Sequence, residues 1–93
     1  MKKSASNGKR KIEFTYKADP EREVFIAGTF NDWDPSKTRL TESDAGLYRV
    51  SIKLPAGRHE YKFVVDGCWQ TDPNNPSSLL NDFGDLNSFI TVD

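Results

Sequence analysis

The chain has 93 residues, enough for one domain with a modest core and too few for two. Hydrophobic residues make up 35% and charged residues 29%, a balance that is typical of a folded globular protein and argues against a disordered one. The formal net charge of −1 gives no electrostatic reason to expect a nucleic-acid partner.

The single cysteine and the absence of long apolar segments limit the cellular compartments in which we expect the chain. Cys68 has no second cysteine to pair with, and a lone free thiol suits a reducing compartment. His59 is also the only histidine, so we expect neither a metal site nor another cofactor. No apolar stretch is long enough to span a membrane, and no signal-type apolar region follows the N-terminal lysines. We therefore expect a cytoplasmic protein without a membrane partner.

The first eleven residues carry many positive charges and show no apolar period. Such a segment could be a basic arm for an anionic partner, but a solvated, flexible terminus is the commoner explanation. We therefore predict a flexible basic tail over residues 1–11 and one folded domain over residues 12–93. The basic residues of the tail are Lys2, Lys3, Lys9, Arg10 and Lys11.

From Ile12 onward the sequence is typical of strands. Apolar and polar residues alternate over residues 12–17, which predicts a half-buried strand. Asp19-Pro20 indicates a turn, and the apolar run at 23–27 predicts a strand that is buried on nearly both faces. Residues 29–36 are rich in Asn, Asp and Pro and indicate a loop.

The middle of the chain repeats this pattern. A brief extended piece is expected at 38–40 and a turn at 43–46. Alternation over residues 47–54 and 59–65 predicts two further strands. Asp66-Gly67 is a strong hairpin signal, because both central residues of the tight turn need positive φ.

A polar segment at 71–78 and a last strand at 87–92 complete the chain. No segment has a helical period, and six or seven short strands alternate with turns. This pattern predicts an all-β sandwich of two antiparallel sheets packed face to face.

The predicted hairpin also predicts which side chains share a face. If Asp66-Gly67 is a two-residue turn, Val64 lies opposite Trp69, and Lys62 is a diagonal neighbour of Trp69. With Tyr61 facing the core, Lys62 and Trp69 would be exposed side by side. An indole beside an ammonium group can stack on a sugar ring and bind its hydroxyls, although a shielding Trp and a solvated Lys are the ordinary alternatives.

Trp33 is the second tryptophan outside the expected core, in a polar loop where it could be a structural anchor or a second sugar platform. Covering one sugar face buries about 60 Å², worth about 1.5 kcal/mol, so two platforms with a few hydrogen bonds give micromolar to millimolar binding.

Catalysis by this chain is disfavoured. A glycosidase needs two carboxylates across a cleft, and the Asp and Glu residues fall mostly in turns and on exposed strand faces. The lone His59 has no nucleophile motif near it.

Three segments closely resemble carbohydrate-binding module family 48. They are residues 24–33 (VFIAGTFNDW), residues 54–69 (LPAGRHEYKFVVDGCW) and Thr71-Asp72-Pro73. The family includes the glycogen-binding domain of the AMP-activated protein kinase β subunit and the N-terminal domains of isoamylases and glycogen-branching enzymes. The resemblance covers roughly residues 12–93. It implies an immunoglobulin-like, early-set β-sandwich that binds α-1,4-linked glucan without catalysis, as an accessory to glycoside hydrolase family 13-type enzymes or to a kinase.

The resemblance also implies a set of binding residues. Sugar rings would stack on Trp33 and Trp69, Lys62 matches the family's binding lysine, and Asn87 matches its late asparagine.

The family's loop that reaches through a glucan ring carries a leucine and a threonine. Phe83 and Asp85 stand at those positions here, as an aromatic surface and a hydroxyl acceptor. The implied partners are an α-glucan (glycogen, starch, a maltooligosaccharide or a cyclodextrin) and a glycan-processing enzyme. The alternative is an early-set sandwich that serves as a protein–protein interaction or scaffold domain.

Overall fold

The computed structural model describes residues 9–93, and in this part of the chain it contains eight strands and no helix. Consequently, none of the described segments is a helix long and apolar enough to cross a membrane. The strands are β1 (Arg10–Lys17), β2 (Val24–Gly28), β3 (Thr41–Asp44), β4 (Leu47–Leu54), β5 (Gly57–Val65), β6 (Cys68–Gln70), β7 (Ser78–Leu80) and β8 (Leu86–Val92).

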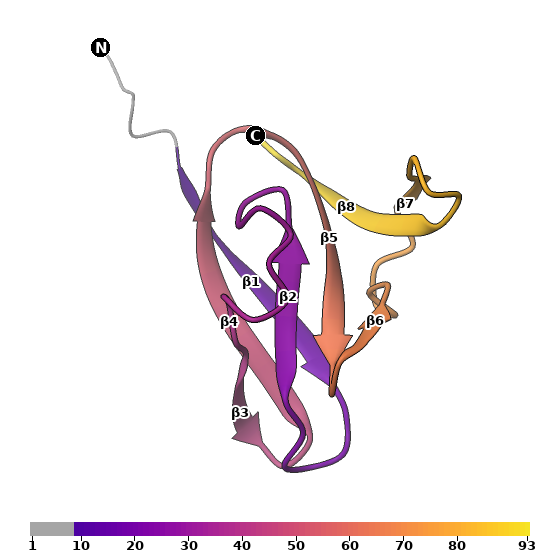
Figure 1. Ribbon diagram of the computed structural model, residues 1–93. Helices are drawn as coiled ribbons and strands as arrows, with labels where there is room; N and C mark the ends of the chain where they lie inside the picture. The colour runs from indigo at the N-terminus through magenta and orange to yellow at the C-terminus, as the bar shows by residue number, and fades with distance from the viewer. Residues whose placement is uncertain (1–8) are drawn as a thin grey trace.

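The strands form two antiparallel sheets that pack face to face, with β1 crossing behind β2 and β5 in Figure 1. One sheet has three strands in the order β1-β4-β3. The other has the order β2-β5-β8-β7, with β6 paired to β5. The all-β sandwich of two antiparallel sheets is therefore confirmed, whereas the immunoglobulin-like, early-set assignment stays a prediction.

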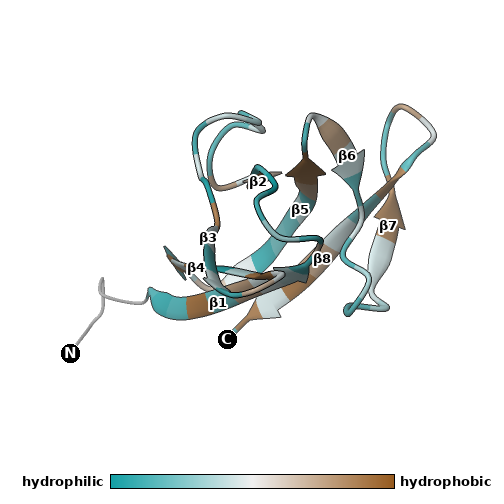
Figure 2. Ribbon diagram, turned by 90° about the horizontal axis from the view of Figure 1, so that it is seen from below, coloured by the Kyte–Doolittle hydropathy of each residue, from teal (hydrophilic) through white to brown (hydrophobic). Residues whose placement is uncertain are grey.

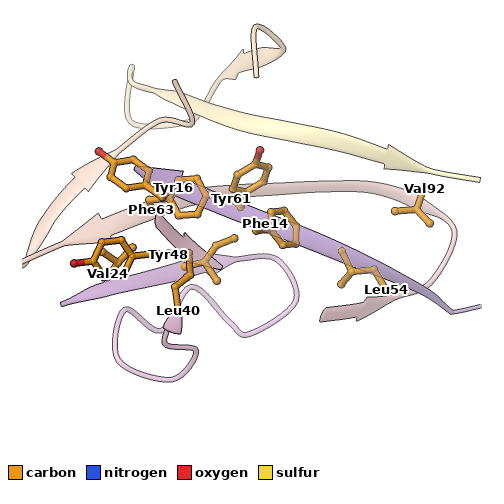
Figure 3. Packing of buried hydrophobic residues seen from close by; sticks show 10 residues of the cluster. Phe14, Tyr16, Val24, Leu40, Tyr48, Leu54, Tyr61, Phe63 and Val92 are labelled. Carbon is orange, nitrogen blue, oxygen red and sulfur yellow. The ribbon is translucent and has the colours of Figure 1, made fainter. Parts of the chain in front are cut away.

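Alternation along each strand sends one set of side chains into the space between the sheets. In β1 and β4 the pairs Phe14–Val50 and Tyr16–Tyr48 lie directly opposite each other and face inward. Leu40 and Leu54 extend this core toward its two sides, as Figure 3 shows. Burial of these apolar side chains is the main stabilising contribution in a domain of this size.

The inward face of β5 provides the opposing aromatic layer. Tyr61 and Phe63 are fully buried, with ring centroids 5.8 Å apart in an edge-to-face arrangement. The ring of Phe14 lies 5.0 Å from that of Tyr61, and the ring of Tyr16 lies 4.9 Å from that of Phe63. The two sheets are therefore joined through packed aromatic pairs at the centre of the molecule (Figure 3).

The Asp66-Gly67 hairpin forms with the predicted register. Asp66 has φ 49° and Gly67 has φ 85°, as the tight turn requires. Val64 pairs with Trp69 and Val65 with Cys68. The turn is fixed because Asp66 accepts hydrogen bonds from Arg22 Nη1 (2.8 Å) and from the backbone N–H of Glu23 (3.0 Å).

Several predicted boundaries differ from the observed ones, among them the following three. The expected turn at 43–46 is shorter, because β3 continues to Asp44, which pairs with Leu47 across a local irregularity. The polar segment at 71–78 ends in β7, a strand that forms because its partner β8 lies beside it. The predicted tail lies outside the described residues as far as residue 8, and β1 already begins at Arg10, which pairs with Leu54.

Candidate functional site

An open cleft of about 730 Å³ lies on the outward face of the β2-β5-β8-β7 sheet. We call it the outer cleft. All six binding residues predicted from the sequence line it, together with five others. The lining residues are Thr29, Trp33, Glu60, Lys62, Trp69, Leu80, Asn81, Asp82, Phe83, Asp85 and Asn87.

Strand β5 provides the floor of the cleft. Because Tyr61 and Phe63 face the core, Glu60 and Lys62 point to the opposite side. Trp69 lies opposite Val64 on that same side, and the residue is 47% exposed. The hairpin therefore places an accessible indole on the same face as the lysine, as the sequence predicted. The prediction that Lys62 is exposed beside it is wrong: the lysine side chain is only 9% exposed and bonds to Asp85 of the loop between β7 and β8.

The loop after β2 brings Trp33 to the cleft in an uncommon backbone conformation. Asp32 (φ 58°) and Trp33 (φ 59°) both occupy the left-handed region. The carbonyl oxygen of Gly28 accepts hydrogen bonds from the backbone N–H groups of Asn31 (3.1 Å) and Trp33 (3.0 Å). These bonds fix the direction in which the loop leaves the sheet.

The buried side chain of Asn31 holds this loop from below. Its Oδ1 accepts from the N–H of Gly28 (2.9 Å), and its Nδ2 donates to the carbonyl oxygen of Ile26 (2.9 Å) and to Thr38 Oγ1 (3.0 Å). Position 28 has no room for a side chain, since a Cβ there would lie 2.5 Å from the carbonyl oxygen of Glu60. The position of Trp33 therefore depends on one buried amide and one glycine.

The loop between β7 and β8 forms another wall and is organised around Asn81. Its Oδ1 accepts hydrogen bonds from the backbone N–H groups of Phe83 (2.9 Å) and Asp85 (3.0 Å). Its own N–H donates to the carbonyl oxygen of Asp85 (2.7 Å). Phe83 stands at the tip of this loop and is 94% exposed. The loop projects on the same side of the molecule as β6, as Figure 1 shows.

An ion pair joins this loop to the floor of the cleft. Lys62 Nζ donates to Asp85 Oδ2 over 2.6 Å, and the lysine side chain is only 9% exposed. The hydrogen bond from Lys62 lowers the pKa of Asp85, with a further contribution from the backbone N–H of Leu86. Asp85 thus stays ionised beside the lysine at neutral pH.

Asn87 is held at both ends of its amide. Its Oδ1 accepts from Asn81 Nδ2 (3.1 Å), and its Nδ2 donates to Glu60 Oε1 (3.1 Å). These two bonds determine which way the amide points. Asn87 therefore presents a defined donor and a defined acceptor to the cleft.

A polar cluster behind the cleft supports β7 and β8. The hydroxyl of buried Tyr61 donates to Asp72 Oδ2 (2.7 Å) and accepts from Asn75 Nδ2 (3.1 Å). Asn75 also donates to the carbonyl oxygen of Phe89 (2.9 Å), and Ser88 Oγ accepts from the N–H of Asp72 (2.8 Å). Burial raises the pKa of Tyr61, so its hydroxyl remains a donor. The core is thereby connected to the strand that carries Asn87.

The sequence did not single out several cleft residues. Glu60 could have been found, because it shares the outward face with Lys62. Asn81 gives no such signal, since its contacts depend on the folded loop. The remaining three are Thr29, Leu80 and Asp82.

The arrangement combines aromatic surfaces with hydrogen-bonding groups, as sites for uncharged polyhydroxylated ligands do. Within residues 9–93, no group of three or more His, Cys, Asp and Glu side chains is placed to hold a metal ion.

Comparison with known proteins matches this chain to one family model. The model describes the glycogen recognition site of AMP-activated protein kinase, and it matches residues 10–93.

Curated relatives match over most of this chain. Protein FLOURY ENDOSPERM 6, chloroplastic, from Oryza sativa subsp. japonica is 37% identical over 75 residues, which cover 81% of this chain and 14% of that protein. The 5'-AMP-activated protein kinase subunit beta-1 of Sus scrofa is 41% identical over 71 residues, covering 76% of this chain and 55% of the subunit. The Homo sapiens subunit beta-1 has the same identity and coverage of this chain, but only 25% of the subunit is matched. The chain thus spans between 14% and 55% of the length of these relatives.

Proposed function

The chain belongs to the family of the glycogen recognition site of AMP-activated protein kinase, a family of carbohydrate-binding modules, and we propose that its outer cleft binds α-1,4-linked glucan without catalysis. The observation that carries the proposal is that six residues implied by the family resemblance, from four separate segments of the chain, line one cleft. A glucan chain of the glycogen or starch type, or a cyclodextrin, is the proposed ligand.

The two tryptophans serve as stacking platforms in this proposal. Trp69 is accessible on β6, and Trp33 is held in place by its loop before any ligand arrives. Each platform that covers a sugar face contributes about 1.5 kcal/mol through burial of about 60 Å². Phe83 adds a third aromatic surface at the tip of the β7–β8 loop.

The polar groups bind sugar hydroxyls and so fix the position of the glucan. Lys62 uses one of its three N–H donors on Asp85, which leaves two for the ligand. Asn87 uses one N–H and one lone pair on its neighbours and keeps one of each for a pair of adjacent hydroxyls. Asp85 accepts from a further hydroxyl.

Glucan binding by this chain would bring a covalently or non-covalently attached partner to the polysaccharide. This part of the proposal draws on the relatives, which are longer than the present chain and include subunits of a kinase. A glycan-processing enzyme or a kinase is the proposed partner.

The test is a titration with maltoheptaose by isothermal calorimetry and tryptophan fluorescence, on wild type and Trp69→Ala. We expect saturable binding by the wild type and a loss of at least about tenfold in the variant, corresponding to about 1.5 kcal/mol. Cys68→Ala is the matched control, because Cys68 is the exposed neighbour of Trp69 on β6 and is not a lining residue of the cleft.

Absence of heat and of a fluorescence change in the wild type would reject glucan binding. The interaction-domain alternative would then take first place, because a shared fold does not guarantee a shared function. Release of reducing sugar during the titration would instead contradict the non-catalytic part of the proposal.

A further inference from the structure

The charges that line the outer cleft are unbalanced. Glu60, Asp82 and Asp85 contribute three carboxylates, whereas Lys62 is the only cation among the lining residues. Glu60 projects from the floor and Asp82 from the β7–β8 loop, so the negative charge is distributed over the floor and one wall of the cleft.

The single cation is already compensated. Lys62 is buried and donates to Asp85 over 2.6 Å, so this pair has no net charge to offer a ligand. Glu60 accepts only a neutral amide N–H, from Asn87, and no described side chain bonds to the carboxylate of Asp82. Among residues 9–93, therefore, two carboxylates of the cleft have no cationic partner.

The next basic residue on this face of β5 does not change the balance. Arg58 is two residues before Glu60 and shares its side of the strand. Its guanidinium lies 5.8 Å from the centroid of the Phe89 ring, and Arg58 is not among the lining residues. The guanidinium is therefore directed to an aromatic face outside the cleft.

We propose that the outer cleft selects uncharged glucan and discriminates against glucan that carries anionic substituents such as phosphate esters, with Glu60 and Asp82 as the residues that set this specificity. The inference rests on the proposed glucan-binding function and adds the chemical class of glucan that the site accepts. Carboxylates accept hydrogen bonds from sugar hydroxyls, so they favour neutral sugar, but they repel a second anion at the same place.

The size of the repulsion between the cleft carboxylates and an anionic glucan can be estimated, because the cleft is open to water. Two charges about 8 Å apart in a water-like medium repel by roughly 0.5 kcal/mol, so two carboxylates together weaken binding about fivefold at low salt. Screening over about 3 Å in 1 M salt should remove most of this difference, whereas a steric clash would persist.

The test uses two β-cyclodextrins that differ in charge but hardly in shape. One bears a single carboxymethyl ether and the other the corresponding neutral carboxamidomethyl ether. Wild type should bind the anionic probe about fivefold more weakly than the neutral one at about 0.01 M salt, and about equally at 1 M salt. Equal affinities at low salt would overturn the inference, as would a difference that salt does not reduce.

Variants of the two carboxylates locate the effect. Asp82→Asn keeps the size of the side chain, and the ratio of the two affinities should fall about twofold; Glu60→Gln combined with Asp82→Asn should bring it near one. Asp44→Asn makes the same chemical change on β3 in the other sheet and should leave the ratio unaltered. An unchanged ratio in the double variant would overturn the assignment, and failure of the neutral probe to bind wild type would overturn the glucan-binding function itself.

Discussion

The two faces of strand β5 belong to two different regions of the molecule. On the inward face, Tyr61 and Phe63 are 1% and 0% exposed and pack against aromatic rings of the opposite sheet. On the outward face, Glu60 and Lys62 line the same cleft as the partly exposed indole of Trp69. Figure 2 shows that β5 is teal, and so hydrophilic, toward its start and brown, and so hydrophobic, at its arrowhead.

The two regions use aromatic side chains for different purposes. In the core, aromatic surface is removed from water and stabilises the fold. In the outer cleft, the surfaces of Trp69 and Phe83 remain accessible. The β7–β8 loop is held by the hydrogen bond that Asn81 Oδ1 accepts from the N–H of Asp85 and by the one that Lys62 donates to Asp85. A single alternation along β5 thus separates core residues, which stabilise the fold, from residues of the proposed glucan-binding cleft.

The same substitution on the two sides should have very different effects. Phe63→Ala removes a buried ring and leaves a cavity, so we expect the free energy of unfolding to fall by about 3–5 kcal/mol. Phe83→Ala removes an exposed ring and should change it by less than about 0.5 kcal/mol. Urea unfolding followed by circular dichroism measures both. Similar losses of unfolding free energy in the two variants would show that Phe83 stabilises the fold. That result would contradict the distinction between core residues and cleft residues.

Asn81 should affect binding more than stability. Asn81→Ala removes the hydrogen bonds that shape the β7–β8 loop and orient Asn87, and we expect maltoheptaose to bind about five- to tenfold more weakly. Asn81→Asp keeps the acceptor for the two backbone N–H groups but loses the donor to Asn87, so its affinity should lie between those of wild type and Asn81→Ala. Calorimetric titration gives the three affinities, and identical values would show that the loop does not need this amide.

The smallest expected effect is a change in the pKa of Asp85. In Lys62→Met, the pKa of Asp85 should rise from its lowered value toward the ordinary aspartate range, because its main hydrogen-bond donor is gone. The pKa of Asp66, which is lowered chiefly by Arg22, should stay where it is and serves as the internal control. Carboxyl ¹³C chemical shifts measured against pH report both groups. A pKa of Asp85 that does not move would show that Lys62 is not its effective partner.

The sign of the linked stability follows from this direction. Because the folded-state pKa of Asp85 is depressed, its contribution is complete above the unfolded-state pKa and is lost as the pH falls through the folded-state pKa. Lys62→Met should show a smaller acid-side loss, because only the backbone N–H of Leu86 still lowers the pKa of Asp85. Urea midpoints measured across the acidic range would reveal the difference.

The sequence predicted those features whose cause is local. Asp66-Gly67 determined a turn type, and the turn determined that Val64 and Trp69 are opposite each other. Likewise, the alternation of apolar and polar residues along β4 and β5 predicted that Tyr48 and Phe63 face inward.

Features that depend on a distant partner were not predictable in this way. Strands β3 and β7 are short and contain Ser, and they form because β4 and β8 offer an edge to pair with. The role of Asn81 arises only when β7 and β8 are side by side, since its amide then reaches both the loop backbone and Asn87. The convergence of Trp33 with Trp69 likewise required the folded chain.

The left-handed conformation of Trp33 has a consequence for the cost of ordering. A bulky L-residue with φ 59° is held in an unfavourable region at a cost of order 1–2 kcal/mol, and Asp32 beside it shares that conformation. The bonds to Gly28 and Asn31 impose this conformation when the domain folds. The backbone of Trp33 is therefore already ordered before a ligand binds. The entropy cost of ordering it does not weaken the affinity for that ligand. In the proposed function, the loop after β2 is therefore preorganised for glucan, and its rigidity is obtained at the expense of global stability.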